Sequence, residues 1–308
     1  MPDSSSPVQK ELLSLTGKKY RFLSDRYYTP PGKFSVTFKG VDEQGLPVLL
    51  KKVFAGQINN EVSMPVRHPV LTPVQDIIRD EQEVYLVQAF KTGKNLRELA
   101  TAHRKKLPLT ESQLLRVVVG VIDGLDAMHG AGWMHGDIKP GNIIVDTTGA
   151  DPAVHVVDFG KASTFGMVDR HDDSFSLVYS APEIVLREYD LAGPSSDFYA
   201  LGITLYELLE RRPAFHHANP ELLMHLMINQ PLPAPRYIPA PLFSVILKMT
   251  HRSVFPRPAH LMERMERRTL LNAAIGQRYQ SAAALTADLE KAWPAFSYPR
   301  PWWKKLVR

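Results

Sequence analysis

The first part of the chain contains short runs in which apolar and polar residues alternate. Such runs occupy Lys33–Lys39, Pro47–Val53 and Val84–Ala89, and Asp42–Gly45 has the composition of a turn between the first two. Alternation with a period of two is typical of β-strands that bury one face. We therefore predict that Tyr20–Phe90 forms a small β-rich lobe.

From Leu96 onward the hydrophobic period changes to that of an α-helix. Thr110 and Gln113 have the spacing of a capping box, which marks the start of a helix. Behind them, apolar residues recur on one wide helical face: Leu114, Leu115, Val118, Ile122, Leu125 and Met128. The pattern predicts a long core helix.

Three further helices are predicted from the same period and from start signals such as Asn219 followed by Pro220. They span Ser195–Leu209, Glu221–Ile228 and Ser281–Ala292. The Pro-rich stretch Pro231–Pro241 is predicted to be a surface connection. With a β-rich first part and a helical second part, the chain of 308 residues is predicted to be an α+β protein whose two lobes share one globular body.

Composition narrows the chemistry. The chain has no cysteine, which excludes disulfides, thiolate zinc sites and a cysteine nucleophile, and we expect a reducing compartment, the cytoplasm. The net charge of +5 is interpreted as solvated surface, so no nucleic-acid partner is predicted. The first residues lack the apolar core of a signal peptide. Asp123 and Asp126 interrupt the most apolar window, Leu114–Met134, which is therefore predicted to be a buried helix rather than a membrane span.

The segment His135–Val145, which follows the long helix, carries the most informative polar residues. Asp137 can accept the proton of an attacking hydroxyl, Lys139 can neutralise phosphate charge, and Asn142 can hold a metal ion. All three duties belong to phosphoryl transfer.

A second polar motif, Asp158-Phe159-Gly160, follows the apolar pair Val156 and Val157. The pattern predicts a carboxylate that emerges at the end of a strand beside a flexible glycine. Mg²⁺ prefers oxygen ligands of this kind, so Asp158 is a candidate magnesium ligand.

These two segments resemble the catalytic loop and the metal-binding loop of eukaryotic-like protein kinases. The resemblance continues through Ala181-Pro182-Glu183 and Ser196–Gly202 to Arg278–Ala282, which is similar to the last subdomain of bacterial serine/threonine kinases. It implies the bilobal protein-kinase-like fold, with a small β-rich N-lobe and a larger helical C-lobe. It also implies a protein kinase that transfers the γ-phosphate of ATP to serine or threonine hydroxyls of a protein substrate.

The resemblance also assigns roles in the larger lobe. It implies that Asp137 is the catalytic base, that Lys139 approaches the transferred phosphate, and that Asn142 and Asp158 hold Mg²⁺. It further implies that Glu183 pairs with Arg278 and that Asp197 braces the catalytic loop. The expected cofactors are ATP and Mg²⁺.

The small lobe resembles the family less closely, because only Gly32 remains of the three glycines of the phosphate-binding loop. Lys51 is favoured over Lys52 as the phosphate-binding lysine, since strand alternation sends the two to opposite faces. Glu61 is either the ion-pair partner of that lysine or a surface carboxylate. The nucleotide-binding set implied by the resemblance is Gly32, Phe34, Lys51, Glu61, Gln88 and Phe90, with Asn142 and Asp158.

Gly136 stands where many protein kinases have an arginine that binds a phosphate in the activation segment. Because that charge is absent, we expect Asp158–Glu183 to reach its active form without phosphorylation. His135 is interpreted as a packed support for the loop, and the histidines of the later loops lack the spacing of a zinc site.

The predicted domain organisation has four parts: an N-terminal extension (1–19), the N-lobe (20–90), the C-lobe (91–292) and a basic aromatic tail (293–308). The C-lobe carries an insertion at about 251–272, rich in arginine, which fits either a partner-docking segment or a solvated helix. The tail, with Trp302 and Trp303, fits a membrane surface or packing on its own lobe, and we favour the latter.

Two other functions fit parts of the sequence. The dipeptide His135-Gly136 before Asp137 also resembles small-molecule kinases of the aminoglycoside phosphotransferase type. Lys139 and the motif Ala181-Pro182-Glu183 favour a protein kinase instead. The reduced glycine loop suggests a pseudokinase that serves as a binding module, but the intact Asp137 and Asp158 oppose it. The sequence carries no sign of oligomeric state.

Overall fold

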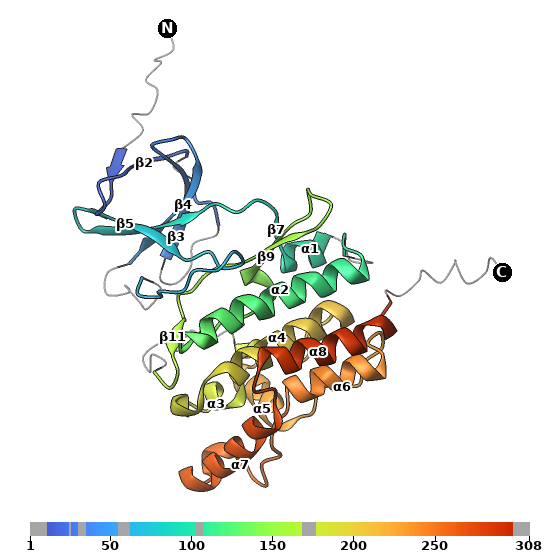
Figure 1. Cartoon of the computed structure of the whole chain (residues 1–308). Helices are drawn as coiled ribbons and strands as arrows, with labels where there is room; N and C mark the ends of the chain where they lie inside the picture. The colour runs from blue at the N-terminus through green and yellow to red at the C-terminus, as the bar shows by residue number, and fades with distance from the viewer. Residues whose placement is uncertain are drawn as a thin grey trace, which may run out of the picture. The chain divides into compact units, whose positions relative to one another are not determined.

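The computed structural model describes residues 11–24, 26–29, 35–54, 62–102, 107–167 and 177–297. The chain divides into two compact units. Unit 1 consists of Met1–Pro65 and Thr72–Lys91, and unit 2 consists of Val66–Leu71 and Thr92–Arg308. Figure 1 shows that the ribbon of unit 1 is mainly strands and that of unit 2 mainly helices, which confirms the predicted α+β class.

Unit 1 is built on one antiparallel sheet with the strand order β1-β2-β3-β4-β6-β5. A bridge between Ser14 and Ile78 joins the two ends of this order. The three predicted strands are confirmed as β3, β4 and β6, whereas β1, β2 and β5 were not predicted. The strand bounds are Glu11–Leu13 (β1), Lys19–Phe22 (β2), Ser35–Asp42 (β3), Pro47–Val53 (β4), Val74–Asp80 (β5) and Glu83–Ala89 (β6).

The predicted turn between β3 and β4 depends on the side chain of Asp42. Its Oδ1 accepts hydrogen bonds from the backbone N–H of Gln44 at 2.9 Å and of Leu46 at 2.8 Å. Gly45 has a φ of +80°, a left-handed conformation that costs glycine little. The turn brings β3 and β4 into register, with Thr37 opposite Lys51.

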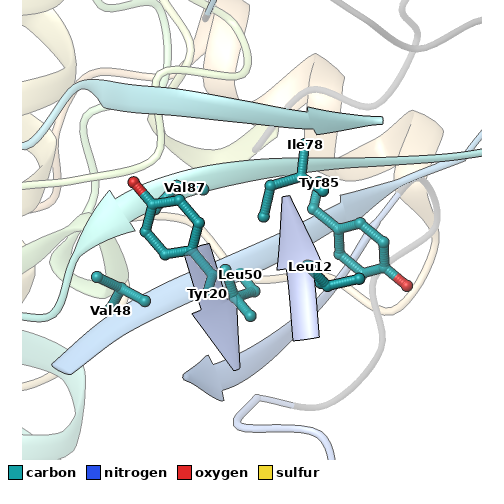
Figure 2. Packing of buried hydrophobic residues seen from close by; sticks show 7 residues of the cluster. All are labelled: Leu12, Tyr20, Val48, Leu50, Ile78, Tyr85 and Val87. Carbon is teal, nitrogen blue, oxygen red and sulfur yellow. The ribbon is translucent and has the colours of Figure 1, made fainter. Parts of the chain in front are cut away.

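One face of the sheet carries the apolar core of unit 1. The buried side chains come from β1, β2, β4, β5 and β6 and gather as Figure 2 shows. Removing such side chains from water stabilises the sheet by about 1.5–3 kcal/mol for each large apolar residue. The members of this core are Leu12, Tyr20, Val48, Leu50, Ile78, Tyr85 and Val87.

Unit 2 contains the four predicted helices, which are confirmed as α2, α4, α5 and α8. Its helices are α1 (Leu96–Ala102), α2 (Glu111–Gly130), α3 (Pro182–Val185), α4 (Pro194–Glu210), α5 (Pro220–Asn229), α6 (Ala240–Met249), α7 (Arg264–Gln277) and α8 (Ala282–Ala292). None of the helices in the described ranges is both long enough and apolar enough to cross a bilayer.

Short strands and turns of unit 2 hold the loops between these helices. The strands β10, β9 and β7 form one small sheet in that order, and β8 pairs with β11. Their bounds are Lys94–Asn95 (β7), Trp133–Met134 (β8), Ile143–Asp146 (β9), Ala153–Val156 (β10) and Ser163–Thr164 (β11), with a 3₁₀ turn η1 at Pro140–Asn142.

The start of α2 is capped as predicted. Thr110 Oγ1 accepts a hydrogen bond from the backbone N–H of Gln113 at 3.2 Å, and Gln113 Oε1 accepts one from the N–H of Thr110 at 2.9 Å. The helix buries the apolar face that the periodicity predicts, with Leu114, Ile122 and Leu125 fully buried. Capping and burial together fix the helix that leads into the candidate catalytic loop.

The segment Val66–Leu71 packs within unit 2, a placement that was not predicted from the sequence. The backbone N–H of Val156 donates to the carbonyl oxygen of Val70 at 2.7 Å. A Cβ at Gly124 of α2 would lie 3.1 Å from side-chain atoms of Val70 and Leu71, so the glycine permits this close approach.

Ion pairs attach the arginine-rich stretch at 251–272 to the rest of unit 2. Glu188 is 1% exposed and accepts hydrogen bonds from Arg267 at 2.6 Å, Arg268 at 2.9 Å and Arg264 at 3.1 Å. Burial works to raise the pKa of Glu188, but these arginines hold it below its ordinary value. Arginine side chains of α7 therefore serve an internal ion-pair network, which neither of the two predicted readings of the insertion includes.

The Pro-rich connection before α6 is anchored by the last residue of α4. The carboxylate of Glu210 accepts hydrogen bonds from the backbone N–H groups of Arg236 at 2.9 Å, Tyr237 at 2.8 Å and Ile238 at 3.1 Å. Glu210 is 3% exposed, so these bonds satisfy a buried charge.

Candidate active site

The candidate catalytic loop runs from the end of β8 to the turn η1, and Asp137 lies at its centre. Lys139 Nζ donates to Asp137 Oδ2 at 2.6 Å. Asn142 Nδ2 donates to the same oxygen at 3.0 Å and to the backbone carbonyl of Asp137 at 2.8 Å. Lys139 and Asn142 thus both contact Asp137 Oδ2, and the loop brings together the three residues that the sequence indicates for phosphoryl transfer.

The other carboxylate oxygen of Asp137 is in a different situation. Asp137 is 6% exposed, and its Oδ1 is buried without a hydrogen-bond partner among the described residues. Buried polar atoms of this kind are uncommon in folded proteins, and a substrate hydroxyl would satisfy this one.

Asp197 of α4 holds the backbone of the loop from within unit 2. Its two carboxylate oxygens accept hydrogen bonds at 2.9 Å from the N–H groups of His135 and Gly136. His129 Nε2 lies 2.9 Å from Oδ2. Burial works to raise the pKa of Asp197, but its hydrogen bonds with His129 and with the backbone of the loop keep it below the ordinary value. These contacts are the brace that the resemblance implied.

Gly136 adopts a backbone conformation that a larger residue would not tolerate. Its φ is +74°, and an added Cβ would lie 2.7 Å from the carbonyl oxygen of Lys161. The local geometry therefore favours glycine where many protein kinases have arginine. Residues 168–176 of the activation segment lie outside the described residues, so activity without phosphorylation stays a prediction.

His135 packs beneath the loop. It is fully buried, its Nδ1 accepts a hydrogen bond from the backbone N–H of Asp137 at 3.2 Å, and its ring lies 5.0 Å from that of Phe159. These contacts support the interpretation of His135 as a packing residue rather than a base.

The hairpin formed by β9 and β10 brings the second motif to the loop. Ile143 pairs with Val156, and the backbone N–H of Val157 donates to the carbonyl oxygen of Asn142 at 3.0 Å. Asp158 is the next residue, with a φ of +65°, a left-handed conformation that is uncommon for aspartate and frequent at functional sites.

The donor chemistry of Asn142 and Asp158 fits Mg²⁺. The amide nitrogen of Asn142 donates to Asp137, so its amide oxygen faces away from Asp137. An amide oxygen and the carboxylate of Asp158 are hard oxygen ligands, which Mg²⁺ prefers together with water and phosphate oxygens. These residues would hold the ion.

Glu183 and Arg278 form the ion pair that the resemblance implied. Arg278 donates to the two carboxylate oxygens at 2.6 and 3.0 Å, and both side chains are fully buried. Ser196 Oγ donates to Glu183 at 2.7 Å, and Arg278 Nε donates to the carbonyl oxygen of His251 at 2.8 Å. A bidentate pair with these added bonds fastens the segment after the catalytic loop to the end of α7.

The predicted nucleotide-binding residues of unit 1 are described in part. Lys51 and Lys52 both lie on β4, and Lys52 forms an ion pair with Glu83. Strand alternation places Lys51 on the other face. Gln88 is buried on β6. The predicted residues Gly32, Phe34 and Glu61 lie outside the described residues.

Phe90 was also predicted to contact the nucleotide. Lys39 Nζ lies 4.4 Å from the centre of its ring, and the ring of Tyr28 lies 5.7 Å away in an edge-on arrangement. This cluster in unit 1 was not predicted from the sequence.

A second group of interacting polar residues in unit 2 was not predicted from the sequence. Tyr179 donates to Glu207 at 2.6 Å, and Arg97 donates to the hydroxyl of Tyr179 at 3.3 Å. Burial, followed by the hydrogen bond to Glu207, raises the pKa of Tyr179, which therefore stays protonated. The three residues come from separate elements, so no local spacing could have connected them.

Comparison with known proteins agrees with this geometry. The family described as protein kinase domain matches residues 31–268. A probable serine/threonine-protein kinase of Streptomyces coelicolor is 30% identical over 182 residues, which cover 55% of this chain and 25% of that protein. The serine/threonine-protein kinase PrkC of Bacillus subtilis is 29% identical over 236 residues, which cover 74% of this chain and 32% of PrkC.

A third similar protein is the serine/threonine-protein kinase PkaA of Streptomyces coelicolor, 28% identical over 201 residues, which cover 64% of this chain and 36% of PkaA. The chain thus spans between 25% and 36% of the length of these three relatives. It belongs to the protein kinase domain family, and these three relatives are named as serine/threonine kinases.

Proposed function

We propose that this chain transfers the γ-phosphoryl group of ATP, in the presence of Mg²⁺, to serine or threonine hydroxyls of a protein. The observation that carries the proposal is the state of Asp137. One of its carboxylate oxygens is held by Lys139 and Asn142, while the other is buried without a hydrogen-bond partner in the described part of the chain.

In this proposal Asp137 Oδ1 accepts the hydrogen bond of the substrate hydroxyl and orients its oxygen for attack. The hydroxyl proton passes to Asp137 as the oxygen bonds to the γ-phosphorus, while the bond from that phosphorus to the β–γ bridging oxygen breaks and ADP leaves. Lys139 Nζ lies 2.6 Å from Oδ2, where its charge can offset negative charge on the transferred phosphoryl group. Bound Mg²⁺ would supply charge neutralisation at the phosphate oxygens.

The remaining residues position this centre. Asp197 fixes the backbone N–H groups of His135 and Gly136, so the Asp137 carboxylate is directed without rearrangement at the moment of reaction. Asn142 and Asp158 supply the oxygen ligands for magnesium. Lys51 is proposed as the lysine that binds the nucleotide phosphates, which is supported by the engagement of Lys52 with Glu83.

The alternatives fit the described residues less well. The buried pair of Glu183 and Arg278 and the similarity to kinases named for serine and threonine favour a protein acceptor over a small molecule. A pseudokinase is opposed by the assembled contacts of Asp137, Lys139 and Asn142. The lack of cysteine supports a cytoplasmic location, which we propose on that ground.

The experiment that separates these functions measures which acceptor takes up label. Purified protein is incubated with Mg-ATP labelled at the γ-phosphate and, separately, an acidic test protein, a basic test protein and an aminoglycoside. We expect label on a protein, at serine or threonine by mass spectrometry, and its loss in Asp158→Asn. The control Asp151→Asn, whose side chain is 75% exposed and paired with Arg116, should keep wild-type activity. Label on the aminoglycoside alone, or on no acceptor, would reject the proposal.

A further inference from the structure

A cavity of about 430 Å³ lies entirely within unit 2, beside the candidate catalytic loop. Its wall includes Pro140, which directly follows Lys139 in the loop, together with residues of α1 and of the C-terminal end of α4. The volume is within the range of sites that hold small ligands or single side chains.

Positive charge predominates on the wall of this cavity. Three arginines line it, Arg97 of α1 and Arg211 and Arg212 after α4, against one carboxylate, Glu207. Arg212 is held in place by hydrogen bonds to the hydroxyl of Tyr206 and the carbonyl oxygen of Ala234, both at 3.2 Å. Its Nε also lies 3.8 Å from the buried carboxylate of Glu210, which partly compensates its charge. Guanidinium groups bind carboxylates and phosphates with paired, charge-assisted hydrogen bonds.

The single carboxylate of the cavity is already engaged. Glu207 accepts the short hydrogen bond from the hydroxyl of Tyr179, and that tyrosine stays protonated because burial and this bond raise its pKa. Arg97 reaches the same hydroxyl. A hydrogen bond from a neutral hydroxyl leaves the charge balance unchanged, and the wall is cationic because three arginines outnumber one carboxylate.

Tyr179 also connects the cavity with the catalytic carboxylate. It lines a second, small space whose wall includes Asp137 and Ser180. A polypeptide that presents a hydroxyl to Asp137 would have flanking residues near Tyr179, whose hydroxyl contacts Arg97 and Glu207 of the cavity wall.

We infer that this cavity binds an anionic side chain of the protein substrate, close in sequence to the residue that is phosphorylated. The ligand chemistry is a carboxylate or a phosphate carried by the substrate chain. The inference rests on the proposed function and gives it a substrate class: serine or threonine residues in acidic or already phosphorylated segments. The structural basis is the position of Arg97, Arg211 and Arg212 around one cavity at Pro140.

The test uses four peptides that share one acceptor serine and differ only in flanking residues: aspartate, phosphoserine, glutamine or lysine. Two quantities are measured with the full chain, binding of labelled peptide by fluorescence anisotropy without ATP, and kcat/KM for transfer with Mg-ATP. We expect the aspartate or phosphoserine peptide to exceed the glutamine peptide by roughly tenfold, the value of one charge-assisted contact. If the aspartate peptide shows the larger increase over the glutamine peptide, the cavity prefers a carboxylate; if the phosphoserine peptide does, it prefers a phosphate.

Two variants connect the preference to the cavity. Arg97→Ala, on an exposed face of α1, should reduce the ratio of anionic to neutral peptide by roughly tenfold. Arg211→Gly is a second variant that fits the left-handed φ of +57° at this position and should act in the same direction. The matched control is Arg116→Ala, an arginine of α2 paired with Asp151 outside the cavity, which should leave the ratio unchanged.

Failure of the inference differs from failure of the proposed function. Transfer that ignores the flanking charge, or an anionic preference that Arg116→Ala weakens as much as Arg97→Ala, overturns the inference alone. A different result is that the anionic peptides bind in an Arg97-dependent way but no peptide is phosphorylated. This result would support the inference about the cavity and reject the proposed kinase activity. Equal binding of all four peptides overturns the inference whether or not transfer occurs.

Discussion

The backbone N–H of Val157 donates to the carbonyl oxygen of Asn142 at 3.0 Å. This bond extends the β9–β10 hairpin by one pair and brings the residue before Asp158 against the last residue of η1. Two candidate magnesium ligands that are sixteen residues apart in the sequence are thereby delivered by one short hairpin. Because a hairpin of this kind is local, the two residues meet across a short sequence separation, and Val70 and Asp197 add contacts from more distant parts of the chain.

The buried ion pair of Arg278 and Glu183 should dominate the stability of unit 2 among its ion pairs. Arg278→Ala leaves the Glu183 charge buried and unpaired, which is expected to cost about 3–5 kcal/mol of unfolding free energy. Urea denaturation followed by circular dichroism measures this cost. The control Arg116→Ala removes an exposed pair and should cost less than about 1 kcal/mol. Equal losses of unfolding free energy in the two variants would show that the buried ion pair stabilises the protein no more than the exposed pair does.

Gly136 should tolerate no side chain. Gly136→Ala adds a Cβ at 2.7 Å from the carbonyl oxygen of Lys161 in a left-handed conformation, which is expected to destabilise the protein by about 1–2 kcal/mol and to displace the neighbouring Asp137. Thermal unfolding and phosphate transfer measure the two effects.

Gly130→Ala is the matched control for Gly136, because no atom lies within 4 Å of its added Cβ. It should be neutral or slightly stabilising. A Gly136→Ala variant with wild-type stability and activity would mean that the backbone is free to adjust at this position.

The network around Glu188 should make stability depend on acid pH. The pKa of Glu188 in the folded state lies below its ordinary value of 4.5, so its contribution is present above pH 4.5 and is lost as the pH falls through the folded-state pKa. The expected observation is a difference in unfolding free energy between wild type and Glu188→Gln that is constant near neutral pH and shrinks below pH 4.5. Urea denaturation from pH 7 to pH 3 measures it, and a difference that grows toward acid pH would contradict the sign.

Lys51 and Lys52 should differ in their effect on nucleotide binding. Lys51→Ala is expected to reduce the rise in melting temperature that Mg-ATP produces, because a ligand stabilises the folded state only as far as it binds. Lys52→Ala removes the pair with Glu83 and should keep the nucleotide-dependent rise. The reverse result would transfer the phosphate-binding role to Lys52.

The predictions from sequence succeeded where the signal was local. The capping box of Thr110 and Gln113 and the cap of Asn219 each occupy only a few residues, and both helices start as predicted. The turn at Asp42 is likewise set by its own side chain. Local hydrogen bonds of this kind are fixed by residue identity and spacing alone.

Short strands and a strand with a buried polar residue were missed. In β2 the burial alternates, but the strand has only four residues, which is too short for a clear pattern. In β5 every second residue is buried from Val74 to Ile78, but one of these positions is Asp76, so the sequence does not show the apolar period of two.

Contacts between residues far apart in the sequence were predicted only where the resemblance to a known family implied them. The pair of Glu183 and Arg278 spans 95 residues and was expected from the resemblance. The contact of Arg267 with Glu188 spans 79 residues and that of Tyr179 with Arg97 spans 82 residues, and neither was expected. The contact of Tyr179 with Glu207 spans 28 residues and was not expected either. These residues meet because of how α1, α4 and α7 pack within unit 2, and hydrophobic periodicity does not predict that packing.

The most direct test of the account is the rate of a single turnover of γ-phosphoryl transfer from Mg-ATP to a protein acceptor in Asp137→Asn. The substitution preserves the shape of the side chain but removes the charge that Lys139 and Asn142 support and the atom that accepts the hydroxyl proton. We predict a rate loss of roughly 10³-fold or more, with the fold intact and Asp151→Asn at the wild-type rate. A rate in Asp137→Asn equal to that of the wild type would contradict the account.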